Sequence, residues 1–90
     1  MASNVNAAVE DIAPLGGTNS KGYRIGYLNS ATKAAQNDTV TITNAKVVEF
    51  AALSLDATGT SQTLTISGNV ITITAATAGA VSGFVYYLAK

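Results

Sequence analysis

The chain has 90 residues with five basic and five acidic side chains, so its formal net charge is zero. It contains no histidine, cysteine or tryptophan. The sequence therefore excludes disulfides, metal sites built on imidazole or thiolate, and nucleophilic catalysis by Cys–His or Ser–His pairs. It also lacks the basic footprint of a nucleic-acid-binding protein, and no stretch reaches the roughly 18–20 apolar residues of a membrane helix.

A low density of charge is the second feature of the composition. Charged residues make up 11% of the chain, against about 25% in ordinary globular domains, and they leave little repulsion to keep copies apart. A single domain of this size buries only roughly 60–65% of its unfolded surface and is close to the limit of stability. We therefore expect a homo-oligomer or a lattice component, in which neighbouring copies cover much of the surface.

The N-terminal region differs from the rest: residues 1–20 predict an arm that precedes a β-domain of residues 21–90. The first six residues have neither a basic region nor an apolar run, so they predict no secretory signal, and we expect synthesis in the cytoplasm. Two structures of the arm are open: a short helix that ends before Pro14, or a segment that orders only against a neighbouring subunit. The helix alternative depends on three apolar residues at helical spacing: Val5, Val9 and Ile12.

The first part of the β-domain alternates with a period of two, which is typical of half-buried strands. A strand over residues 23–28 places on one face Tyr23, Ile25 and Tyr27. Residues 30–37 are expected to connect it to the next strand, with room for one helical turn. Residues 38–44 alternate cleanly, so we expect Val40 and Ile42 to point inward between outward threonines.

A β-hairpin over residues 62–74 is the strongest local signal. Its Gly68-Asn69 pair is typical of a two-residue turn, which sets Ile66 opposite Ile71 and Leu64 opposite Ile73. This register gathers the large apolar residues except Val70 on one face and the threonines on the other. A slip of one residue would mix them, so the pattern predicts the turn.

Two further strands have less regular patterns. The run over residues 46–55 alternates poorly, which predicts a strand that is covered on both faces or broken by a bulge. The run over residues 81–90 carries bulk on both faces, which predicts a central strand with a bend or a close backbone approach at Gly83. Six strands joined by short turns favour an all-β fold, a small antiparallel β-sandwich or barrel with an extended N-terminal arm.

The acidic residues do not predict a catalytic site. Asp38 and Asp56 lie at turns, where we expect their side chains to bond the local backbone. Glu10 and Asp11 are adjacent, so their side chains diverge. Glu49 is expected to be an edge residue or a partner for a cation on a neighbouring copy. We predict no catalytic, cofactor-binding or metal-binding residue, and no enzymatic activity.

Candidate contact residues come instead from the tyrosines and from the arm. Tyrosines bury their ring and keep the hydroxyl bonded, so they suit a core or a subunit contact. A stacking platform for single-stranded nucleic acid is disfavoured by the zero net charge. The residues predicted to contact a neighbouring subunit or a capsid are Val5, Val9, Ile12, Leu15, Tyr23, Tyr27, Tyr86 and Tyr87.

Three segments carry a resemblance to a known class of proteins: Asp-Thr-Val-Thr-Ile-Thr-Asn at 38–44, Asn-Val-Ile-Thr-Ile-Thr at 69–74, and Gly-Ala-Val-Ser-Gly-Phe-Val-Tyr-Tyr at 79–87. With them the chain resembles small tailed-phage virion proteins, namely capsid decoration (cement) proteins and related neck or tail components, over roughly residues 36–90. No catalytic or ligand motif takes part in the resemblance.

The resemblance implies a β-sandwich or barrel that forms a homo-oligomer, often a trimer. It also implies copies on the outer surface of the virion capsid that bridge major capsid proteins, with an arm that orders on docking. Our leading expectation is a bacteriophage capsid decoration protein that binds neither nucleic acid nor membrane. Two alternatives stay open: another self-assembling virion component (a neck, tail or fibre subunit), and a small carbohydrate- or surface-binding β-module.

Overall fold

Two four-stranded sheets make up the fold, with no helix in the described part of the chain. The computed structural model describes residues 4–14, 23–33, 36–75 and 78–89. Sheet A has the order β1-β4-β7-β6 and sheet B the order β2-β3-β8-β5. The strands are β1 (Asn4–Ala7), β2 (Glu10–Pro14), β3 (Tyr23–Lys33), β4 (Asp38–Ile42), β5 (Ala45–Leu55), β6 (Leu64–Ser67), β7 (Val70–Ile73) and β8 (Gly79–Ala89). The predicted all-β class is confirmed.

One hydrophobic core lies between the two sheets. Sheet A contributes four side chains that are 0–1% exposed: Val40, Ile42, Ile71 and Ile73. Sheet B contributes to the same cluster, among others, Leu28, Leu53, Val81, Val85 and Tyr87. Because successive residues of a strand point to opposite faces, each of these residues leaves its chain neighbours on the outer face of its sheet.

The β6–β7 hairpin has the register that the sequence predicts. Ser67 pairs with Val70, Ile66 with Ile71 and Leu64 with Ile73. The turn is closed by Gly68, whose φ of +60° suits a residue without a Cβ. The predicted inward positions of β4 are also confirmed, since Val40 and Ile42 are buried.

Strand β5 contains bulges, which explain why residues 46–55 alternate poorly. Its pairing with β8 shifts between Ala45 and Val47 and again between Val48 and Phe50. The second shift changes the parity of the buried positions from Val48 to Ala51. The alternative of cover on both faces is wrong, because Phe50 is 54% exposed.

Strand β8 is central in sheet B, as predicted, and Gly83 is the point of close approach. A Cβ added at Gly83 would lie 1.8 Å from the carbonyl oxygen of Ala52 on β5. No Cβ fits there, so glycine is required at this position for β8 to pair closely with β5.

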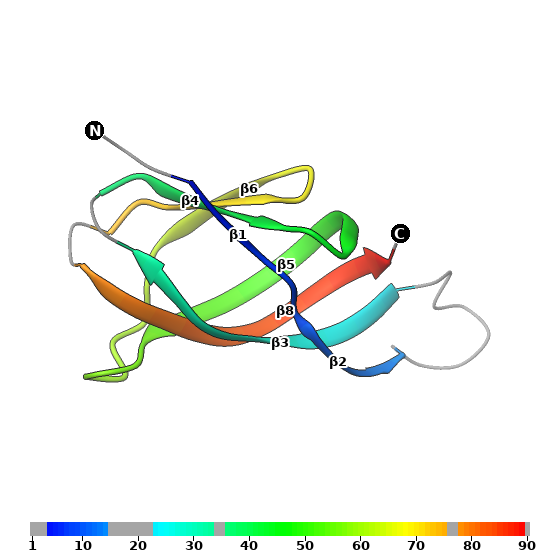
Figure 1. Cartoon of the computed structure of the whole chain (residues 1–90), viewed down its shortest axis with the longest axis horizontal. Coiled ribbons are helices and arrows are strands. Elements are labelled where there is room, and N and C mark those ends of the chain that lie inside the picture. The colour runs from blue at the N-terminus through cyan, green and yellow to red at the C-terminus, as the bar shows by residue number, and fades with distance from the viewer. Residues whose placement is uncertain (1–3, 15–22, 34–35, 76–77, 90) are drawn as a thin grey trace.

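The predicted N-terminal arm is wrong for residues 4–14, which supply β1 and β2, and the described residues form eight strands where six were expected. Strand β1 pairs in parallel with β4, and β2 pairs antiparallel with β3. The chain thus crosses from sheet A to sheet B, as the blue segment in Figure 1 shows. The helix alternative is also wrong: Val9 is 4% exposed while Ile12 is 53% exposed. Val5, Ala7 and Val9 follow the period of a strand.

Residues 30–37 were predicted to connect two strands, but the first four of them belong to β3, which continues to Lys33. The pairing of β3 with β8 shifts between Leu28 and Ala31. Ser30 lies inside this irregularity with a φ of +54°, an uncommon conformation for a residue with a Cβ. The strand therefore bends where the sequence suggested that it would end.

Candidate interaction surface

The outer face of sheet B gathers aromatic and aliphatic side chains in three rows that run across β3, β8 and β5. The register sets Tyr23, Leu88 and Val47 side by side, then Ile25, Tyr86 and Phe50, then Tyr27, Phe84 and Ala52. None of the nine residues is charged. We call this surface the aromatic face, and it consists of Tyr23, Ile25, Tyr27, Val47, Phe50, Ala52, Phe84, Tyr86 and Leu88.

Three rings of the aromatic face are unusually exposed. Phe50 is 54%, Phe84 49% and Tyr86 37% exposed. Single exposed apolar residues are common on proteins, whereas a contiguous cluster marks an interaction site. The aromatic face is therefore the strongest candidate for a functional surface in the described part of the chain.

Neighbouring rings hold one another in tilted arrangements. The centroids of Tyr27 and Phe84 lie 5.5 Å apart with an interplanar angle of 70°. Those of Phe50 and Tyr86 lie 5.6 Å apart at 53°. The first pair has the edge-to-face geometry that aromatic quadrupoles favour, and the second pair is tilted. The ring planes are inclined to one another, so the rings form an uneven surface and no coplanar platform.

A polar contact borders the aromatic face at β5. The Tyr23 hydroxyl donates a hydrogen bond of 2.9 Å to Oε1 of Glu49. This bond raises the pKa of Tyr23, because losing the proton would place two negative charges together. Glu49 lies on β5, which is an edge strand of sheet B, so the expectation of an edge position is confirmed.

The outer face of sheet A is different in kind, being built of threonine and asparagine. Thr39, Thr72 and Thr65 lie opposite one another on β4, β7 and β6. The hydroxyls of Thr39 and Thr41 both donate to Oδ1 of Asn4, at 2.7 and 2.9 Å. Because these polar groups bond one another, this face has less need of a partner.

Residues on either side of β6 make backbone hydrogen bonds to the edge strand β5. The Val48 N–H donates to the Gly68 carbonyl at 2.8 Å, and the Gln62 N–H donates to the Leu53 carbonyl at 2.9 Å. A strand from another molecule would have to break these bonds to pair with β5. Association at this side is therefore less favourable than association through a sheet face.

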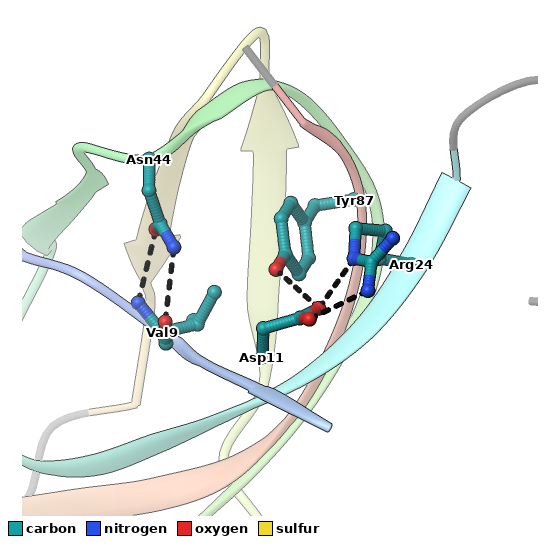
Figure 2. A network of polar contacts seen from close by, with 5 residues as sticks. All are labelled: Val9, Asp11, Arg24, Asn44 and Tyr87. Atoms are coloured by element: carbon teal, nitrogen blue, oxygen red, sulfur yellow. Dashed lines mark hydrogen bonds and ion pairs between the residues drawn. The ribbon is translucent and has the colours of Figure 1, made fainter. Parts of the chain in front are cut away.

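The opposite side is closed by the crossing segment at Val9, which is held by Asn44. The Val9 N–H donates to Asn44 Oδ1 at 3.1 Å, and Asn44 Nδ2 donates to the Val9 carbonyl at 2.9 Å (Figure 2). The side-chain amide thus bonds the one residue that lies between β1 and β2 and is buried. It satisfies backbone groups that neither sheet pairs at this point.

Asp11 holds the next part of the same segment. Its carboxylate accepts from Nε and Nη2 of Arg24, both at 2.6 Å, and from the Tyr87 hydroxyl at 3.1 Å (Figure 2). The bond from Arg24, together with that from Tyr87, lowers the pKa of Asp11 below its ordinary value, while desolvation opposes this shift. Burial first, and then the bond to Asp11, raises the pKa of Tyr87. This network fastens β2 to sheet B.

Asp56 bonds distant strands rather than the local backbone, so that part of the turn prediction is wrong. The Ser30 hydroxyl donates to its Oδ2 at 2.7 Å. The pKa of Asp56 is lowered mainly by a hydrogen bond from Ser82 and, to a smaller extent, by one from Ser30. The Ser30 N–H donates to Ser82 Oγ at 2.8 Å, so the cluster pins the bend of β3. Asp38 is 1% exposed at the start of β4.

The predicted contact residues lie in several different environments. Tyr23, Tyr27 and Tyr86 lie on the aromatic face, Ile12 is exposed on β2, and Val5 is half-buried opposite Val40. For Val9 and Tyr87 the prediction of a contact is wrong. Their side chains are 4% and 2% exposed and belong to the core, so neither is available to a partner. Leu15 lies outside the described residues.

Sequence reasoning missed several residues of the aromatic face, above all Phe50 and Phe84. Phe84 shares its parity with Tyr86, so the alternation of β8 could have assigned it. Phe50 could not be assigned, because the bulge between Val48 and Phe50 changes the parity of β5.

No set of acidic side chains in the described residues could hold a metal ion, and no pocket is found on them. None of the described segments forms a helix that could span a membrane. The chain matches no family model, no curated protein and no solved structure.

Proposed function

We propose that this protein is a non-enzymatic structural component of a bacteriophage virion, a capsid decoration protein built on a β-sandwich. One observation carries the proposal: three half-exposed rings, Phe50, Phe84 and Tyr86, lie together on the outer face of sheet B. Such a face gains stability when another protein surface covers it. The resemblance to decoration proteins adds the kind of assembly that would supply that surface.

Several features favour a protein surface as the partner over a polysaccharide or a nucleic acid. Sugar rings and bases stack on flat aromatic faces, whereas these ring pairs are tilted by 70° and 53°. The net charge is zero, which provides no attraction for phosphates. Uneven apolar surfaces with a few bonded hydroxyls are typical of protein interfaces.

In this role the protein acts by mass action. Copies made in the host cytoplasm bind the outer surface of the assembled capsid better than they bind free major capsid protein, and so stabilise the shell. Each contact is modest, but many copies act together on one particle. This role needs no cofactor.

Capsid occupancy tests the proposal. Capsids of the encoding phage, assembled without the protein, are incubated with the native chain or with Phe84→Ser, and bound copies are counted by cryo-electron microscopy. Phe84 is half exposed, so the variant should keep its fold, which circular dichroism checks. We expect Phe84→Ser to reduce occupancy at least about tenfold at limiting protein, while the matched control Thr65→Ser on sheet A leaves it unchanged.

Equal occupancy by Phe84→Ser and the native chain would overturn the assignment of the aromatic face. Labelling of a neck, tail or fibre in place of the head would overturn decoration in favour of another virion component.

A further inference from the structure

We draw no further inference here: the strongest candidate, the aromatic face on the outer side of sheet B, belongs to the surface that the proposed function already uses, and nothing in the described residues shows what covers it.

Discussion

At the scale of single residues, the side chain of Asn44 makes to the Val9 backbone the two hydrogen bonds that a neighbouring strand makes elsewhere in the sheets. Its amide accepts from the Val9 N–H and donates to the Val9 carbonyl. Val9 is 4% exposed, so these backbone groups have little access to water. The amide is thus a specific requirement of a chain that crosses between sheets.

Asn44→Ala is predicted to lower the free energy of unfolding by about 2–3 kcal/mol, because it leaves a buried donor and acceptor without partners. Asn44→Asp keeps an acceptor for the N–H but turns a carboxylate oxygen toward the carbonyl, so it should not restore stability. Urea unfolding measures both. The exposed Asn6→Ala is the control and should change stability by no more than about 0.5 kcal/mol; an equal loss in both alanine variants would contradict the role of Asn44.

Asp11 predicts how stability depends on acid. Its pKa in the folded protein is lowered, chiefly by the bond from Arg24, below the ordinary value of 3.8. A depressed carboxyl pKa contributes stability that is present above the unfolded pKa and is lost as pH falls through the folded pKa. We therefore expect the contribution of Asp11 to be complete above about pH 5 and to disappear toward about pH 2.

Asp11→Asn should remove part of this acid-dependent loss, which thermal unfolding at a series of pH values would show. The effect should shrink with added salt, since Arg24 and Asp11 are 33% and 42% exposed. Asp56→Asn is the comparison, because its pKa is lowered by serine hydroxyls and not by a cation. An unchanged pH profile in Asp11→Asn would contradict the role of the ion pair.

At the scale of the strands, β8 fits between its neighbours because of Gly83. Gly83→Ala would push a methyl group to within 1.8 Å of the Ala52 carbonyl oxygen. We expect a loss of more than about 3 kcal/mol, measured by urea unfolding. The control is Gly68→Ala, which has open space but a φ of +60° and should cost about 1 kcal/mol. A smaller loss at Gly83 than at Gly68 would contradict the close approach.

Local patterns predicted the strands whose partners are close in sequence. The Gly68-Asn69 turn fixed the register of β6 and β7, because two residues leave one way to oppose the apolar positions. The strands β1 and β2 could not be predicted in this way. Val5, Val9 and Ile12 fit a helical spacing as well as Val5 and Val9 fit a strand, and the parallel partner of β1 lies 35 positions further along the chain.

The candidate surface, too, could be predicted only where local alternation assigns its residues. Tyr23 and Tyr27 share a face by simple alternation, and Tyr86 follows from the alternation of β8. Tyr87 was misassigned, since its ring belongs to the core while its hydroxyl reaches Asp11 at the edge. A tyrosine with this dual character has no distinct signal in sequence.

At the scale of the whole molecule, two faces of opposite chemistry enclose one core. The threonine and asparagine groups of sheet A bond one another, whereas sheet B leaves its rings in contact with water. The β5–β6 bonds and the crossing segment close the sides. Among the surfaces formed by the described residues, the aromatic face is therefore the one through which association gains the most free energy.

Hydroxyl-radical footprinting of the protein bound to the proposed capsid, compared with the free chain, tests this claim most directly. We predict that Phe50, Phe84 and Tyr86 become protected in the particle, while Val70, half-buried on sheet A, reacts equally in both samples. Unchanged labelling of the three rings, with protection of Val70 instead, would contradict it.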